Sequence, residues 1–180
     1  MENNVYLLEC PETHDALLVD GCFEPEKILD ACEGANIVGI VQTHGHADHV
    51  QALPSLVERL GVPIYAHEGE DYPVAVNRKI SDGDTIHFGD REAQVLFTPG
   101  HTDGGVCLLI GEHLISGDTL FPGGPGNTWG SKEAFARIIE AIETKLFTLP
   151  DATRVYPGHG DDTTIGVEKP HLEEWRERGW

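Results

Sequence analysis

The six residues from His44 to His49 include four potential metal ligands, in the order His-x-His-x-Asp-His. The segment follows an apolar run at 37–41 that is bounded by glycine and polar residues and is typical of a buried strand. The residues at 50–60 have the apolar spacing of a helix, with Pro54 in its first turns. The segment is therefore predicted to join a strand to a helix at the edge of a sheet.

The backbone of this loop decides how its ligands can be shared between ions. In an extended segment, residues two apart point to the same side, so His44 and His46 can bind one ion together. The turn into the helix redirects the next side chains, so Asp48 and His49 can bind a second ion close by. Such a dense cluster directly after a strand is not typical of solvent-exposed histidines on a polar loop. We interpret it as a metal site.

Three further candidate ligands follow predicted strands in the same way. They stand in Pro99-Gly100-His101, Ser116-Gly117-Asp118 and Pro157-Gly158-His159. The glycine before each ligand allows the backbone to approach a crowded centre. A single Pro-Gly-His turn is more often only a turn, but strand ends can converge at one edge of the sheets. We therefore expect all these ligands to meet there.

Strands and helices alternate along the chain, with hairpins between some of the strands. Helices are predicted at 25–31, at 50–60 and at 132–146, with Ser131 as N-cap of the last one, and Thr163 or Thr164 can cap a closing helix. The pattern forms two similar halves, one to about Phe97 and one from about Val106, and predicts an α/β fold of two mixed sheets packed face to face with helices outside. Strands are predicted at 5–8, 16–19, 37–43, 62–66, 85–88, 93–98, 106–110, 114–116 and 154–156.

Composition is ordinary for a globular protein. The 180 residues are expected to form a single domain, 1–180. The first residues lack the basic and apolar regions of a signal peptide, and no apolar run is long enough to span a membrane, so a cytoplasmic protein is expected. The four cysteines, Cys10, Cys22, Cys32 and Cys107, lack CxxC spacing and are expected to be reduced thiols.

The charge balance limits the partners of the chain. There are 31 acidic and 12 basic residues, a formal net charge of −19. Such a surface repels phosphate backbones, which argues against nucleic acid as a partner. A small-molecule substrate is expected, with no membrane partner, and the sequence does not fix the oligomeric state.

With these residues in this order, the sequence resembles the metallo-β-lactamase superfamily, and within it the short, single-domain branch similar to glyoxalase II (hydroxyacylglutathione hydrolase). The resemblance covers nearly the whole chain. It implies a four-layer αββα sandwich with two divalent metal ions in the cleft between the sheets. The ligands that it implies are His44, His46 and His101 for the first ion, Asp48, His49 and His159 for the second, and Asp118 as a bridge between them.

The implied chemistry is hydrolysis, with Asp48 and Asp118 as the catalytic carboxylates. Imidazoles and carboxylates suit zinc, with iron or manganese as alternatives. Two ions about 3.5–4 Å apart can share a hydroxide, because coordination lowers the pKa of water towards roughly 7. The bridging hydroxide would attack a carbonyl that one ion polarises, while the other ion stabilises the leaving group.

Other branches of the superfamily fit the sequence less well. Diiron oxygen or nitric-oxide reductases have Glu where this chain has His46, and well-known zinc β-lactamases have Cys where it has Asp118. Relatives that process RNA need a basic surface and additional substrate-binding elements. These differences favour the glyoxalase II-like branch.

Two departures from longer glyoxalase II enzymes concern the substrate. The C-terminal helical domain that contributes to their glutathione site is expected to be absent. The loop Gly123–Trp129 has Asn127 where a basic residue is expected to meet the thiol carrier. Phe121, Asn127 and Trp129 are the candidate substrate-binding residues, and Tyr156 is a further aromatic candidate for the pocket wall.

The favoured hypothesis is a hydrolase of a small acyl-thioester. A lactonase or other ester hydrolase with the same ligands is the alternative, because the ligand set does not separate thioesters from lactones. An iron persulfide dioxygenase is less favoured, since it too usually carries Arg in the loop that contains Asn127. A metal-binding protein without catalysis is disfavoured because every ligand and flanking glycine is present.

Overall fold

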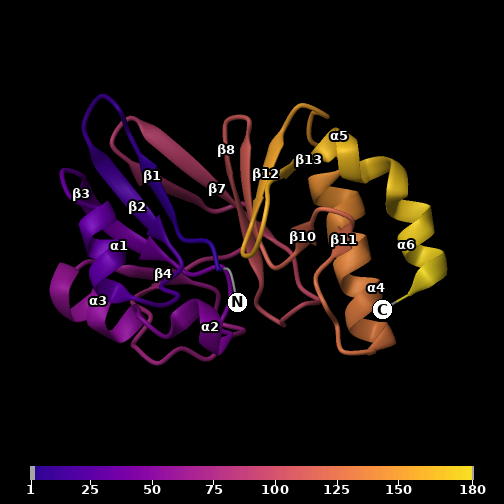
Figure 1. Ribbon diagram of the computed structural model, residues 1–180, viewed down its shortest axis with the longest axis horizontal. Coiled ribbons are helices and arrows are strands. Elements are labelled where there is room, and N and C mark those ends of the chain that lie inside the picture. The colour runs from indigo at the N-terminus through magenta and orange to yellow at the C-terminus, as the bar shows by residue number, and fades with distance from the viewer. Residues whose placement is uncertain (1–2, 180) are drawn as a thin grey trace.

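Two β-sheets lie face to face in the computed structural model, which describes residues 3–179 (Figure 1). The first sheet has the strand order β1-β2-β3-β4-β5, the second β13-β12-β9-β8-β7-β6, and β10 and β11 form a separate hairpin. The strands are β1 (Tyr6–Glu9), β2 (Asp15–Val19), β3 (Asn36–Val41), β4 (Ile64–Ala66), β5 (Arg78–Lys79), β6 (Thr85–Phe88), β7 (Arg91–Phe97), β8 (Val106–Ile110), β9 (His113–Gly117), β10 (Leu120–Phe121), β11 (Gly124–Pro125), β12 (Arg154–Pro157) and β13 (Thr163–Thr164).

Helices cover the outer face of each sheet. In Figure 1, α1 and α3 lie outside the first sheet, and α4 and α6 lie outside the second. The expected αββα sandwich is therefore confirmed. The helices are α1 (Pro25–Ala31), α2 (Ala47–Val50), α3 (Leu53–Leu60), α4 (Lys132–Ala141), the π-helical turn η1 (Ile142–Leu146), α5 (Ile165–Glu168), the 3-10 turn η2 (Lys169–His171) and α6 (Leu172–Arg178).

Neighbouring side chains of the central strands pack alternately between the two sheets and against the outer helices, which produces the four layers of the sandwich. In β2, Leu17 packs in the hydrophobic cluster between the sheets, whereas Leu18 packs in the cluster with α1 and α3. In β8, Leu108 belongs to the cluster between the sheets and Cys107 to the cluster with α4 and α6. Successive side chains of a strand point to opposite faces, so strands that bury both faces must lie in the middle of the sandwich.

The boundary between the two halves differs from the prediction. Strands β6 and β7 pair with each other, and β7 pairs with β8, so all three belong to the second sheet. The first half therefore ends after β5 rather than near Phe97. The expected boundary was wrong because two antiparallel hairpins join β6 and β7 to β8, so the second sheet begins earlier in the chain than predicted. The spacing of apolar residues identifies a strand but does not show which sheet it joins.

Local signals were more reliable. The Ser131 hydroxyl accepts a hydrogen bond from Ala134 N and caps α4, as predicted, and the Thr164 hydroxyl accepts one from Val167 N at the start of α5. The helix predicted at 50–60 is observed as α3, and the short helix α2 precedes it and begins at Ala47, inside the segment of ligands. All four cysteines are free and buried. Among residues 3–179, no helix combines the length and apolar character needed to cross a membrane.

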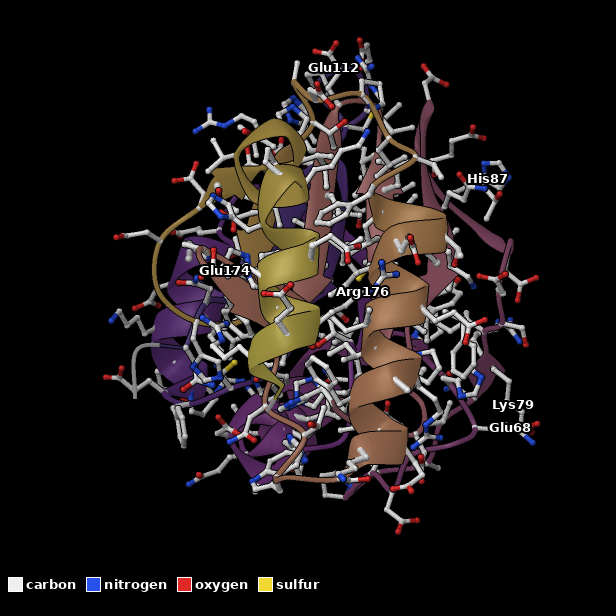
Figure 2. The ribbon with its side chains drawn as sticks, turned by 90° about the vertical axis from the view of Figure 1, so that its right-hand side faces the viewer. Glu68, Lys79, His87, Glu112, Glu174 and Arg176 are labelled. Carbon is white, nitrogen blue, oxygen red and sulfur yellow. The ribbon has the colours of Figure 1, made fainter. Side chains whose placement is uncertain are left out.

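The last helix is anchored by its core side as well as by surface ion pairs. Figure 2 shows α4 and α6 side by side, with Arg176 between them, and the guanidinium of Arg176 lies 2.5 Å from the carboxylate of Glu143 in η1. On the inner side, Trp175 is 1% exposed and its ring lies 5.9 Å from that of Phe147. Because exposed ion pairs contribute little, Trp175 is the main anchor of α6.

We predict that Trp175→Ala lowers the free energy of unfolding by about 3–5 kcal/mol, the usual effect of removing a fully buried large aromatic side chain. Urea denaturation measures this difference. The matched control is Val167→Ala, whose side chain is 58% exposed, and it should change stability by less than about 0.5 kcal/mol. Equal losses in the two variants would contradict the anchoring role of Trp175.

Candidate metal centre

Strand direction brings the predicted ligands to one edge of the sandwich. Strands β7 and β9 are each antiparallel to β8, and β12 is parallel to β9, so β7, β9 and β12 all end at the same edge of the second sheet. His101, Asp118 and His159 follow these three strands, and the segment from His44 to His49 follows β3 of the first sheet. The side chains from the two sheets meet in the cleft between them.

His44, His46 and His101 form the first group of ligand atoms, which lie within 4.8 Å of one another. His101 Nε2 is 3.0 Å from His46 Nδ1. Two nitrogens on one tetrahedral zinc ion would be separated by about 3.3 Å, given Zn–N distances near 2.0–2.1 Å. The first group is therefore compact enough to bind one ion.

Asp48, His49 and His159 form the second group, again with ligand atoms within 4.8 Å of one another. His49 Nε2 is 3.1 Å from His159 Nε2, and His159 Nε2 is 3.4 Å from Asp48 Oδ2. Asp48 and His49 lie in α2, and the His49 ring also lies 4.2 Å from that of His44, so the two groups of ligands are neighbours.

The carboxylate of Asp118 lies between the two groups. Its Oδ2 is 3.4 Å from His101 Nε2 and 3.4 Å from His159 Nε2, while its Oδ1 is 3.5 Å from His49 Nε2. A single carboxylate is thus within reach of both groups. This is the position that a bridging ligand needs. The structure brings all seven predicted ligands together, while their binding of metal stays a prediction.

Hydrogen bonds fix the orientation of three of the imidazoles. His49 Nδ1 donates to Asp20 Oδ2 at 2.8 Å, and His101 Nδ1 donates to the Asn127 carbonyl at 2.9 Å. His44 Nδ1 lies 3.1 Å from the Thr43 hydroxyl, which itself donates to Asp20 Oδ2 and so accepts from His44. Each ring therefore keeps its Nε2 lone pair for the centre, because the proton is held on Nδ1.

Two buried polar atoms indicate that a cation fits here. His44 Nε2 and Asp118 Oδ1 have no hydrogen-bond partner among the described residues. Leaving such atoms unpaired in a protein interior is unfavourable, so a partner of another kind is expected. A divalent ion accepts lone pairs from both imidazole and carboxylate, and this donor set suits zinc, iron or manganese.

Electrostatics favour the same conclusion. Burial raises the pKa of Asp118 to about 7, and the charges of Asp20 and Asp48 add to this effect while His49 opposes it. Burial also lowers the pKa of His101 to about 4 and that of His44 well below its usual value, and neighbouring imidazoles add to both shifts. His44 and His101 are therefore neutral ligands, and a bound cation would stabilise the ionised form of Asp118.

Asp20 is a functional residue that the sequence interpretation missed. It is 2% exposed and accepts hydrogen bonds from His49, from the Thr43 hydroxyl and from Thr43 N. Burial alone would lower the pKa of His49, but Asp20, together with the charges of Asp118 and Asp48, outweighs it and the pKa rises to about 8. Asp20 follows strand β2 as the other strand-end residues follow theirs, but its glycine, Gly21, stands after it rather than before it.

Glu70 connects the two ligand loops and was also missed. Its carboxylate accepts from Gly45 N at 3.1 Å and from Gly104 N at 2.7 Å. Gly45 lies between His44 and His46, and Gly104 lies three residues after His101. Glu70 therefore fixes the position of one ligand loop relative to the other. No local pattern around residue 70 predicts this contact.

Glycine is required where the loop after β12 passes Asp118. A Cβ atom on Gly158 would lie 2.2 Å from Asp118 Oδ1 and 2.7 Å from His49 Cε1. Real side chains do not tolerate such distances, so Gly158 allows His159 to reach the centre. The sequence predicted this close approach for the glycine that precedes His159.

Trp129 forms part of the rim of the centre, as expected for a substrate-binding candidate. It lines a cleft of about 370 Å³ together with five of the predicted ligands and Ala47. Its side chain is 64% exposed, and its ring lies 5.0 Å from that of His101 and 5.4 Å from that of His46. The cleft thus has an aromatic wall on the side of the first group.

The other candidate substrate residues lie beside this cleft. Phe121 stacks on His159, and both Phe121 and Asn127 line an adjacent hollow of about 290 Å³. Asn127 Oδ1 accepts from Trp129 N at 2.7 Å, so this side chain supports the loop that presents Trp129. Tyr156 instead contacts Tyr6 and His113, and it lines neither hollow.

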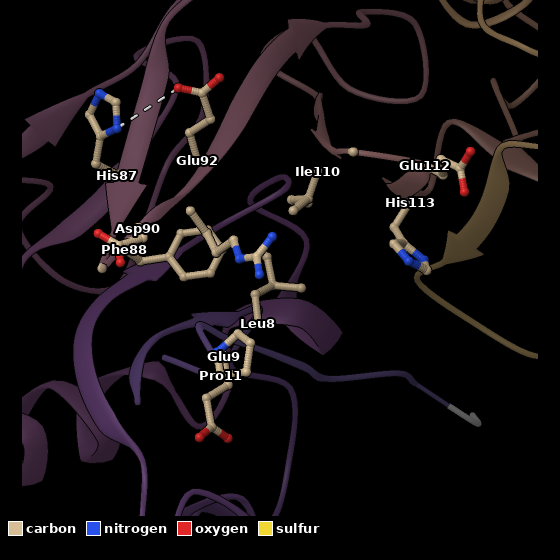
Figure 3. A pocket seen from close by; sticks show the side chains of 13 residues that line it. Leu8, Glu9, Pro11, His87, Phe88, Asp90, Glu92, Ile110, Glu112 and His113 are labelled. Atoms are coloured by element: carbon tan, nitrogen blue, oxygen red, sulfur yellow. Dashed lines mark ion pairs between the residues drawn. The ribbon is translucent and has the colours of Figure 1, made fainter. Parts of the chain in front are cut away.

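A separate groove of about 910 Å³ lies at the hairpin turns, at the end of the sheets away from these ligands (Figure 3). His87 and His113 line it, and Nδ1 of His87 is 4.0 Å from the Glu92 carboxylate. The other histidines outside the ligand set make contacts elsewhere: His14 with Glu9, His67 with Phe97 and His171 with Glu174.

The fold and the geometry of the centre define a superfamily. Residues 1–159 match the metallo-beta-lactamase superfamily, and the chain belongs to it. A hydroxyacylglutathione hydrolase of Polaromonas sp. (strain JS666 / ATCC BAA-500) is 37% identical over 161 residues, which are 86% of this chain and 60% of that protein. The predicted similarity to the glyoxalase II branch is thus confirmed, although the chain spans less than two thirds of this relative.

Two solved structures are similar over most of the chain. ETHE1 from Myxococcus xanthus has a TM-score of 0.87 and 31% sequence identity, covering 95% of this chain and 78% of that one. TTHA1623, in a di-iron-bound form, has a TM-score of 0.78 and 34% identity, covering 93% and 92% of the two chains. The second structure shows that a similar protein holds two metal ions.

We predict that Asp20→Asn weakens metal binding by about 10- to 100-fold, the usual effect of removing the acceptor that orients a ligating histidine. An amide cannot accept from all the donors that Asp20 serves. Competition with a chromophoric chelator measures the change. Asp15→Asn is the control: Asp15 begins β2, the strand that Asp20 follows, and accepts from the exposed side chain of Asn36, so this variant should bind metal like the unmodified chain. Equal affinity in both variants would contradict the role of Asp20.

Proposed function

We propose that this chain is a binuclear metal-dependent hydrolase that cleaves a small acyl-thioester. The observation that carries the proposal is the position of Asp118 between two compact groups of ligands at the floor of an open cleft. Similarity to hydroxyacylglutathione hydrolases supports hydrolysis and a thioester substrate.

Two divalent ions bound at this centre would supply an activated water and a Lewis acid for the substrate carbonyl. The first ion would be held by His44, His46 and His101, and the second by Asp48, His49 and His159, with Asp118 shared as their bridge.

The remaining residues of the site bind and orient the substrate in this proposal. Trp129 provides a rigid aromatic wall against which an apolar part of the substrate can pack. Phe121 contributes an apolar surface beside His159. No Lys or Arg lines either hollow in the described part of the chain. The site therefore suits an acyl group and a thiol carrier that are uncharged near the scissile bond.

Zinc is the proposed metal, because neutral imidazoles and carboxylates match its preferences. Iron is the second candidate, since TTHA1623 holds two irons on a similar fold. An iron centre would favour oxygen chemistry, so metal identity and reaction type must be measured together.

The decisive experiment combines elemental analysis of the purified protein with four substrates: a neutral acyl-thioester, S-D-lactoylglutathione, a lactone and a persulfide. We expect two ions per chain and release of thiol from the neutral thioester. His46→Ala and Asp118→Ala should each lose nearly all turnover, whereas His171→Ala, whose imidazole is an exposed partner of Glu174, should retain it. Oxygen uptake with the persulfide and no thioester cleavage would favour the iron enzyme, and cleavage of the lactone alone would favour the lactonase.

We further predict weak activity on S-D-lactoylglutathione and its improvement by Asn127→Arg. A cation in this loop would meet the remote carboxylates of glutathione and bind substrate and transition state alike. Such uniform binding lowers KM and leaves kcat nearly unchanged. The net charge of −19 adds long-range repulsion of anionic substrates in the unmodified chain.

Steady-state kinetics test this prediction against a matched variant. Asn127→Leu also removes the hydrogen bond to Trp129 N but adds no charge, so it should not lower KM. A KM in the low micromolar range for the unmodified chain would show that other groups already anchor the thiol carrier.

A further inference from the structure

The segment from Asn3 to Tyr6 runs beside the loop that carries His159. Asn3 pairs with His159 in an antiparallel bridge, and Asn4 N donates to the Gly158 carbonyl at 2.8 Å. Asn4 Nδ2 and the Tyr6 hydroxyl donate to further carbonyls of this loop. The backbone around His159 is therefore fixed by residues from the other sheet.

The side chain of Asn3 makes a second connection. Its Nδ2 donates to Asp48 Oδ2 at 3.1 Å and to the Asp48 carbonyl at 3.2 Å. The opposite amide orientation would direct Oδ1 at two acceptors, so the nitrogen must face Asp48. In this orientation Oδ1 is buried and has no partner among residues 3–179. The Asn3 amide thus donates to Asp48 although its own Oδ1 remains without a hydrogen-bond partner.

These contacts involve only the second group of ligands. Asn3 holds Asp48 through its side chain and His159 through its backbone, which are two of the three members of that group. The first group, His44, His46 and His101, is held by Thr43, Glu70 and the carbonyl of Asn127 instead. The two groups therefore depend on different parts of the chain for their orientation.

The chemistry of the donor matters as well as its position. Asp48 Oδ2, which accepts from Asn3, is also the oxygen that faces His159 Nε2 at 3.4 Å and His49 Nε2 at 3.9 Å. A neutral amide fixes the rotation of this carboxylate without cancelling its charge. A lysine at the same place would compete with the ion for the carboxylate.

We propose that Asn3 is a positioning residue for the second metal ion and that it sets the affinity of that ion with little effect on the first. The proposal rests on the two-ion centre proposed above. It predicts that loss of the Asn3 amide weakens one of two metal-binding steps by about 10- to 100-fold, as is usual for groups that orient a metal ligand, and changes the other by less than about twofold.

The test follows release of zinc from the two-ion protein by a competing chelator, which requires no substrate. Asn3→Ala should weaken one step only. Asn4→Ala removes the side-chain bonds to the carbonyls of Pro157 and Gly160 without touching Asp48, so it should have a smaller effect. Asn36→Ala, which removes an Asn–Asp hydrogen bond to Asp15 on the surface, should change neither step.

Two backgrounds assign the affected step to a group of ligands. In a His46→Ala chain, which keeps the second group intact, Asn3→Ala should still lower the affinity for the remaining ion. In a His159→Ala chain the effect should be lost. Equal weakening of both steps, an effect of Asn4→Ala as large as that of Asn3→Ala, or no effect of Asn3→Ala would overturn the proposal. A single ion in the unmodified chain would instead overturn the two-ion centre itself.

Discussion

The repulsion among buried ligands at the edge of the sandwich is the constraint on which the rest of this structure depends. Five imidazoles converge there with the carboxylates of Asp48 and Asp118. Burial and the charges of Asp20 and Asp48 raise the pKa of Asp118 to about 7 against the opposing effect of His49, so in the absence of a cation the ionised form of this carboxylate is disfavoured. Bound divalent ions would turn this repulsion into attraction, and the surrounding scaffold is built to keep the ligands in place.

That scaffold draws each supporting contact from a different part of the fold. Asp20 at the end of β2 orients His49, and the carbonyl of Asn127 orients His101. Glu70 connects two ligand loops, and Asn3 connects Asp48 to the loop after β12. Because the two sheets pack through one hydrophobic cluster between them, these contacts are held by a rigid body while the cleft stays open to a substrate.

Much of the fold could be predicted from the sequence because its signals are local. Alternating and continuous apolar runs identified the strands, and the Ser131 cap marked the start of α4. The boundary between the halves was placed near Phe97 because sequence periodicity does not reveal that β6 and β7 join β8. The pairing of a strand depends on its packing against the other strands of the sheet, and a short segment of sequence does not show which strands those are.

The sequence by itself determined the set of candidate ligands: a dense His44-to-His49 loop and three strand-end residues, each beside a glycine. Only the tertiary structure decided how they are used. The contacts of Asp20 with His49 and of Asn3 with Asp48, 45 residues away along the chain, arise from packing between distant segments. Such contacts leave no local pattern, because their free energy depends on where the two sheets place each end of the pair.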